Sequence, residues 1–152
     1  MKKALEKSLK ATRFTHKDDL NKKWYVVDAN GKVLGRMASK IARILWGKNS
    51  AKFTPNIDTG DFVVVINAEK VRLTGKRESL KTYLSHSTYP GGQKERTFRE
   101  LIKKHPDKVI HNAVWGMLPK TRLGKRIITK LKVYAGDSHP HLAQNPIPVK
   151  DL

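Results

Sequence analysis

A run of five apolar residues near the middle of the chain limits the folds that are open to it. The run extends from Phe62 to Ile66, reads FVVVI, and is flanked by the polar residues Asp61 and Asn67. A strand with no alternation of apolar and polar residues is buried on both faces, which is typical of a parallel sheet between helical layers. A shorter apolar run, from Trp24 to Val27, predicts a second strand.

Helical periodicity follows the run at Trp24. Leu34, Met37, Ile41 and Leu45 recur at three- and four-residue spacing. This spacing places all four on one face of a helix, so the sequence predicts an amphipathic helix directly after the first strand.

The second half of the chain contains two further helix starts. Thr97 and Glu100 have the spacing of a capping box, which predicts a helix from Thr97 to about Lys104. Another helix is expected to begin at Pro106, because proline is tolerated in a first turn, and to end near Gly116. Each helix would need a partner surface for its apolar side chains, which indicates a layered core.

The order of these signals predicts an α/β fold. Residues 80–86 and 131–134 are weaker strand candidates, so strands and helices alternate along the chain. We expect a single layered α/β domain over residues 24–136. Residues 1–23 are polar and basic and are predicted to form an N-terminal extension, and residues 137–152, with three prolines, an extended C-terminal tail.

The charge of the chain indicates a polyanionic partner. The 152 residues include 32 Lys and Arg against 13 Asp and Glu, a formal net charge of +19. Such an excess destabilises a compact state through self-repulsion unless a polyanion is present. Nucleic acid is the commonest such partner and an anionic membrane surface is the alternative, but no apolar run approaches the roughly 20 residues of a membrane span. The absence of cysteine excludes disulfide and thiolate chemistry.

The cations are concentrated in stretches that contain no acid. Residues 29–57 contain six Lys or Arg, and residues 117–132 contain six more, within a predicted amphipathic helix. Loops with Gly or Pro can approach a sugar-phosphate chain closely, and several such loops and arms suit a folded RNA. The residues that this pattern predicts to contact RNA are Arg36, Lys40, Arg43, Arg77, Lys120, Arg122, Lys125, Arg126, Lys130 and Lys132.

Three ring side chains near the middle of the chain are candidates for stacking on unpaired bases. They are Tyr83, His86 and Tyr89, and Tyr83 is equally a candidate for the core. No helix-turn-helix spacing and no Cys/His finger is present, so the sequence favours RNA over DNA.

Motifs for catalysis and metal binding are weak. The glycine turn at residues 31–36 has neither the GxxxxGK[ST] nor the GxGxxG spacing, which argues against a nucleotide-binding enzyme. Asp58-Thr59-Gly60 matches the aspartic protease motif, whose two carboxylates share a proton, so a single copy would require a homodimer. The alternative is a turn before the strand at residue 62. His139 and His141 lack further ligands nearby in sequence, so we predict no metal and no cofactor.

Nine short motifs occur in one order along the chain. They are WYVVDA from Trp24, LGR from Leu34, FTP from Phe53, DTGD from Asp58, INAEKV from Ile66, TGK from Thr74, PGG from Pro90, GMLPK from Gly116 and LKVYAG from Leu131. Together they resemble the bacterial form of large-subunit ribosomal protein L13 across residues 24–142. The sequence departs from that family at Trp46 and Trp115, where the family more often has a basic residue.

The resemblance implies a three-layer α/β/α domain around a mainly parallel four-stranded sheet. It implies a structural protein of the cytoplasmic large subunit, with no catalysis, no membrane and no small-molecule substrate. Such a protein would bind large-subunit ribosomal RNA, contact neighbouring ribosomal proteins and support early assembly. The alternative is a free RNA-binding regulator or assembly factor. RNA contact is implied at Arg36, Lys48, Lys52, Lys76, His86, Lys94, Lys120, Arg122, Lys125, Lys130 and Lys132.

Overall fold

Four parallel strands form the central sheet of the computed structural model, which describes residues 15–16 and 20–149. The strands are β1 (Trp24–Asp28), β2 (Phe62–Ile66), β5 (Leu131–Val133) and β6 (Ile147–Pro148), in the spatial order β5-β2-β1-β6. Both runs that were predicted as strands are confirmed, and they pair in register from Trp24 with Phe62 to Asp28 with Ile66. Val63, Val64 and Val65 of β2 are fully buried, as expected for a strand covered on both faces.

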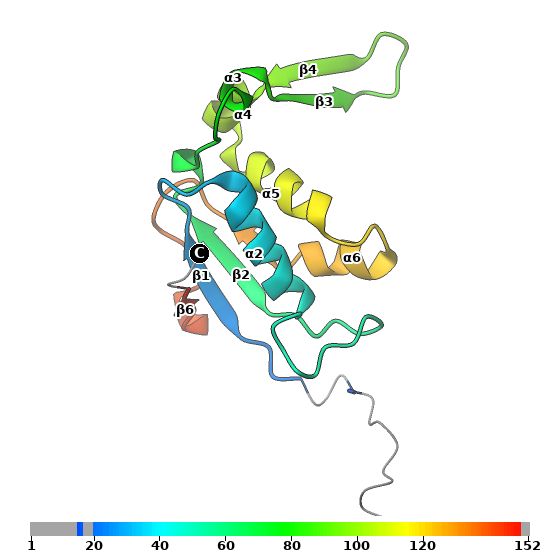
Figure 1. Cartoon of the computed structure of the whole chain (residues 1–152), viewed down its shortest axis with the longest axis vertical. Helices are drawn as coiled ribbons and strands as arrows, with labels where there is room; N and C mark the ends of the chain where they lie inside the picture. Colours follow the sequence, from blue (N-terminus) through cyan, green and yellow to red (C-terminus); the bar gives the residue numbers. More distant parts are fainter. Residues whose placement is uncertain (1–14, 17–19, 150–152) are drawn as a thin grey trace, which may run out of the picture.

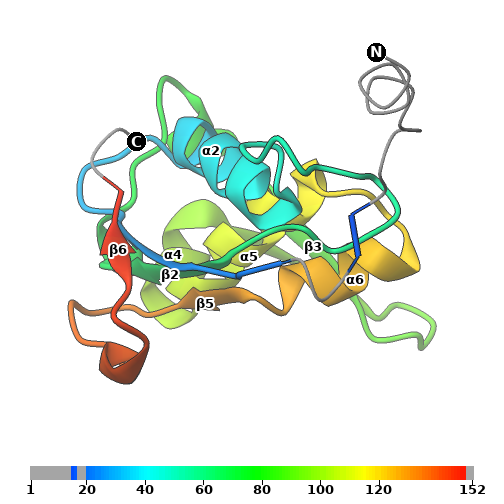
Figure 2. The same cartoon turned by 90° about the horizontal axis from the view of Figure 1, so that it is seen from below.

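Two helices cover one face of this sheet and form most of the core (Figures 1 and 2). Helix α2 (Leu34–Trp46) buries its predicted apolar face, and α5 (Pro106–Met117) packs against α2 and β5. Helix α2 ends at Gly47, which has a φ of +83° and donates its backbone N–H to the carbonyls of Arg43 and Ile44. The helix end is therefore well defined, and it fixes where the following loop begins.

The other face of the sheet carries aromatic rings and the C-terminal segment. The rings of Trp24 and Phe62 stack with centroids 4.4 Å apart, and the His141 ring lies 5.1 Å from that of Trp24. The segment includes a 3-10 turn, η3 (Leu142–Gln144), and then enters β6, which pairs with β1. The α/β class and the three-layer order are confirmed, and the second outer layer is thin.

The C-terminal segment is more ordered than a tail of this composition suggests. His141, which lies in the predicted tail, is half-buried, and its Nε2 lies 2.8 Å from the Tyr134 hydroxyl. The N-terminal extension predicted for residues 1–23 falls largely outside the described residues. From Leu20 onward the chain runs into β1.

An antiparallel hairpin projects from the helical side of the domain (Figure 1). Its strands are β3 (Thr82–His86) and β4 (Gln93–Thr97). The strand predicted at residues 80–86 therefore exists, but it does not join the central sheet. Strand β4 reads QKERT and has no apolar side chain to bury, so no periodicity revealed it.

Short helices connect the hairpin to the rest of the fold. The 3-10 turn η2 (Ala68–Lys70) and α3 (Arg77–Leu80) precede it, and α4 (Phe98–Lys104) follows it. The capping box of Thr97 and Glu100 at the start of α4 is confirmed. Helix α6 (Arg122–Ile128) follows α5 and packs against both α2 and α5.

Candidate nucleic-acid interface

Helix α2 presents a cationic surface on its exposed side. Arg36, Lys40 and Arg43 are all exposed, while the opposite side of the helix is buried in the core. Their spacing of four and three residues places them in one row, and α2 contains no acidic residue. We call this row the α2 cations. A row of this kind can follow a phosphate backbone without an acidic side chain to repel it.

Helix α6 presents a second cationic surface. Arg122, Lys125 and Arg126 are exposed, and none of the three forms an ion pair with a described residue. We call them the α6 cations. The helix buries Ile127 and Ile128 in the core. Because these apolar side chains face inward, the three charges face outward.

The position of α6 depends on a close contact at its start. The Thr121 hydroxyl accepts a hydrogen bond from the Gly124 N–H at 3.2 Å and caps the helix. A Cβ atom on Gly124 would lie 1.8 Å from the Pro119 carbonyl oxygen. Glycine therefore lets the first turn of α6 pack against the chain that leads into it, and this contact sets the direction of the α6 cations.

Two lysines near this surface are held against tryptophan rings. The Lys48 ammonium lies 4.1 Å from the ring centroid of Trp46, at the end of α2, and the Lys120 ammonium lies 4.2 Å from that of Trp115, in α5. Lys120 also donates a hydrogen bond to the Trp115 carbonyl. These cation–π contacts orient both exposed charges. At the two positions where the sequence departs from the resembled family, each tryptophan thus holds a cation.

The hairpin carries its predicted contacts on different faces. Lys94 faces Ser85 across the ladder and shares a face with Arg96, which lies opposite Tyr83. His86 lies on the other face, and its Nδ1 accepts a hydrogen bond from the Thr88 N–H at 2.9 Å. Arg96 is not among the residues predicted to contact RNA, although two cations two residues apart on a strand share a face.

Tyr83 belongs partly to the core. Its ring packs against the hydrophobic cluster, and burial raises the pKa of its hydroxyl. The Lys81 ammonium lies 5.1 Å from its ring centroid. Of the two roles considered for Tyr83, the structure supports packing at the base of the hairpin.

Most of the predicted RNA-binding residues are exposed, but they do not converge on one site. The hairpin lies near the start of α5, whereas the α6 cations lie beyond the end of α5. Because a helix of 12 residues spans roughly 18 Å, α5 separates the two groups by about that distance. Lys132 is half-buried in a groove of about 550 Å³ between α5 and β5. The exposed members are Arg36, Lys40, Arg43, Lys48, Lys52, Lys76, Arg77, His86, Lys94, Lys120, Arg122, Lys125 and Arg126.

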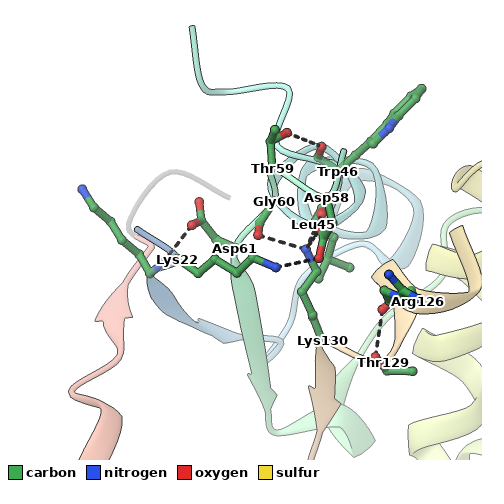
Figure 3. Close-up of polar contacts among 11 residues, drawn as sticks. Lys22, Leu45, Trp46, Asp58, Thr59, Gly60, Asp61, Arg126, Thr129 and Lys130 are labelled. Atoms are coloured by element: carbon green, nitrogen blue, oxygen red, sulfur yellow. Dashed lines mark hydrogen bonds and ion pairs between the residues drawn. The ribbon is translucent and has the colours of Figure 1, made fainter. Parts of the chain in front are cut away.

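Lys130 is an exception, and its expected role is corrected. Its side chain is 5% exposed, and its ammonium donates to the Gly60 carbonyl at 2.9 Å, the Leu45 carbonyl at 3.2 Å and the Asp58 carboxylate (Figure 3). All three protons of the ammonium thus have acceptors inside the protein. Lys130 connects the end of α2, the loop before β2 and the start of β5, and it is not available to RNA.

The Asp58 carboxylate is bound by two lysines. Burial alone would raise its pKa, but the hydrogen bonds and charges of Lys130 and Lys22 outweigh burial and hold the pKa below its usual value. The Lys22 ammonium lies 2.7 Å from Asp58. Burial lowers the pKa of the Lys130 ammonium, and the neighbouring Asp58 offsets part of that shift.

These contacts identify Asp58-Thr59-Gly60 as a structural turn and exclude the protease interpretation. A protease dyad needs a proton shared between two carboxylates, whereas Asp58 is paired with ammonium groups. A Cβ on Gly60 would lie 1.7 Å from the Leu45 carbonyl oxygen, so the turn packs directly on the end of α2. Within the described residues no cluster of three or more His, Asp or Glu side chains could hold a metal ion. No helix in that part of the chain is long and apolar enough to cross a membrane.

Comparison with known proteins gives one consistent family. The model of the family described as ribosomal protein L13 matches residues 22–140. The large ribosomal subunit protein uL13 of Pelodictyon phaeoclathratiforme is 60% identical over 132 residues, which cover 87% of this chain and 89% of that protein. The uL13 of Chlorobium phaeobacteroides strain DSM 266 is 53% identical over 147 residues, 96% of this chain and 99% of that protein. The uL13 of Maridesulfovibrio salexigens is 57% identical over 129 residues, 85% of this chain and 91% of that protein.

Proposed function

This chain belongs to the ribosomal protein L13 family, whose members are structural constituents of the large ribosomal subunit. We propose that it binds large-subunit ribosomal RNA directly and supports early assembly of that subunit. Its relatives are named as ribosomal proteins and not as enzymes. In this role the protein acts in the cytoplasm as part of the ribosome, with RNA and neighbouring ribosomal proteins as its partners.

The exposure of the cations is the observation that carries the proposal. Of the fifteen residues predicted to contact RNA, thirteen are exposed, and twelve of these are Lys or Arg on a chain with a net charge of +19. Exposed Lys and Arg neutralise phosphates and release counterions, which supplies affinity that does not depend on sequence. Because the cations spread from the hairpin to α6, they suit several RNA segments better than one short duplex. A protein that joins separate RNA segments stabilises their folded arrangement, which supports a role in assembly.

Binding to large-subunit RNA is expected to depend steeply on salt. If about six to ten phosphates are neutralised, affinity should fall by about three to five decades between roughly 50 and 200 mM salt. The measurement is a filter-binding or fluorescence titration of the purified full chain on protein-free large-subunit RNA at several salt concentrations. A salt dependence near zero would contradict phosphate neutralisation as the source of affinity.

The α6 cations offer a local test of the same mechanism. Lys125→Ala combined with Arg126→Ala should weaken binding to all RNA sequences and reduce the slope of log affinity against log salt by about two. Both side chains are exposed, so the thermal unfolding midpoint should stay near that of the unchanged protein. The matched control exchanges the two residues, Lys125→Arg with Arg126→Lys, which keeps both charges and should keep the slope. An unchanged slope in the alanine variant would remove α6 from the interface.

A further inference from the structure

The two faces of the β3–β4 hairpin differ in chemistry. Residues that lie opposite each other across an antiparallel ladder share a face, and successive residues alternate between faces. Tyr83, Ser85, Lys94 and Arg96 therefore form a cationic face. The opposite face consists of Thr82, Leu84, His86, Gln93, Glu95 and Thr97, and we call it the Leu84 face.

The Leu84 face does not have the composition of an RNA contact. His86 is its one residue that was predicted to contact RNA, and the His86 Nδ1 already accepts the Thr88 N–H. Leu84 is 65% exposed and lies opposite Glu95 in the ladder. Glu95 is exposed and forms no ion pair with a described residue. The Glu95 carboxylate would repel phosphate, and a phosphate backbone would offer Leu84 no apolar contact. On a chain this basic, the face fits a partner of different chemistry.

Exposed apolar surface is concentrated around this hairpin. Six large hydrophobic residues are exposed in the described part of the chain, and three of them lie between residues 80 and 89. They are Leu80, Leu84 and Tyr89. Leu80 ends α3, just before the hairpin, whereas Leu84 and Tyr89 lie on the hairpin itself. Single exposed apolar residues are normal, so their concentration here supports an interaction site only together with the charge of the Leu84 face.

The hairpin also has too little contact with its own domain to be stable by burial. Only Tyr83 among its strand residues packs against the core cluster, and the other strand residues of β3 are exposed. A two-stranded hairpin is marginally stable in water without a packed face. Its tip is nevertheless well shaped, because Ser87 donates its N–H to the Gly92 carbonyl at 3.1 Å and a Cβ on Gly92 would lie 2.2 Å from the Ser87 hydroxyl oxygen. A hairpin with a defined turn and little buried surface of its own is suited to binding a partner that covers it.

We propose that the Leu84 face docks onto another protein of the large subunit, through a segment that offers an apolar side chain to Leu84 and a Lys or Arg to Glu95. Charge complementarity favours this partner, since Glu95 has no ion-pair partner among the described residues and lies on a face that phosphate would avoid. The inference rests on the proposed function, because the cationic face then lies on RNA. The hairpin is in that case a wedge between RNA on one side and protein on the other.

Adjacent residues on opposite faces permit a matched cross-linking experiment. A benzophenone-bearing amino acid replaces Leu84 in one variant of the full chain and Ser85 in the other, and each is assembled into large subunits and irradiated. Ribonuclease and protease treatments then separate RNA adducts from protein adducts, and mass spectrometry identifies the cross-linked peptide. We expect position 84 to label a peptide of another ribosomal protein that contains Lys or Arg, and position 85 to label RNA. Labelling of RNA from position 84, or of neither RNA nor protein, would overturn the inference.

A charge reversal tests the Glu95 contact with the same readout. With the probe at position 84, Glu95→Lys should reduce the yield of the protein adduct by about tenfold or more, because a repulsion between like charges would replace the proposed attraction. Glu95→Asp keeps a carboxylate at the same ladder position and should keep most of that yield. An equal yield with and without Glu95→Lys would overturn the proposed pairing.

The failure of this inference is separable from a failure of the proposed function. Sedimentation of the unmodified chain shows whether it enters large subunits and stays there through a moderate-salt wash. If it does not, the proposed function fails. If it does, and position 84 labels no protein, only the docking of the Leu84 face fails.

Discussion

Val65→Asp is expected to abolish the folded state. Val65 is fully buried in β2, and its neighbours in the ladder are Val27 on β1 and Val133 on β5. None of these neighbours can pair with a carboxylate, so an aspartate there would be buried without a partner, at a cost of several kcal/mol. Total stability of a domain is about 5–15 kcal/mol, and the lost valine packing adds to the cost. Circular dichroism and thermal unfolding of the purified variant measure the result.

An exposed strand residue supplies the control for this substitution. Leu84→Asp makes a similar apolar-to-acid change on the hairpin, where the side chain is in water. Repulsion from the facing Glu95 costs less than about 1 kcal/mol, so the unfolding midpoint should fall only slightly. At Val64 the same change would place the carboxylate opposite Lys132, so position 65 gives the cleaner result. A cooperative transition of Val65→Asp near that of the unchanged protein would contradict the placement of β2 at the centre of the sheet.

Lys130→Met is expected to destabilise the domain by about 3 kcal/mol, since removal of one partner of a buried ion pair leaves the other charge, here the Asp58 carboxylate, buried without that partner. The Asp58 side chain is 15% exposed and would keep only Lys22, while the carbonyls of Leu45 and Gly60 would each lose a donor. Urea denaturation should show a lower midpoint with a similar slope. The variant should still bind RNA at low temperature once folded, because the buried Lys130 ammonium does not reach the interface.

A double-mutant cycle distinguishes this ion pair from a general packing defect. Asp58→Asn combined with Lys130→Met also removes the unpaired carboxylate. The double variant should therefore lose less unfolding free energy than the sum of the two single losses, by at least about 1 kcal/mol. Additive effects of the two substitutions would mean that Asp58 and Lys130 do not stabilise each other.

The parts of the fold with an apolar pattern could be predicted from the sequence. The strands at Trp24 and Phe62, the face of α2 and the start of α5 all follow from periodicity and capping, since burial demands apolar residues at fixed spacing. Strands β4 and β6 could not be predicted in this way. Strand β4 is exposed, and β6 is two residues long and contains a proline at the sheet edge.

The candidate RNA interface could be predicted in composition but not in every member. The acid-free stretches identify α2 and α6, because a helix that buries one side must expose the other. Lys130 could not be separated from its exposed neighbours, since its partner Asp58 lies 72 residues away in sequence. Its place between the buried residues Ile128 and Leu131 is the only local sign that it differs.

The two lysines held on tryptophan rings have a consequence for the thermodynamics of association. A lysine free in solvent loses up to about 2 kcal/mol of rotamer entropy when a ligand immobilises it. Lys48 and Lys120 are already restrained by Trp46 and Trp115. Part of that ordering is complete when the domain folds, so these two cations are preorganised. In the proposed RNA complex each phosphate that they contact would therefore be bound with a smaller entropic penalty.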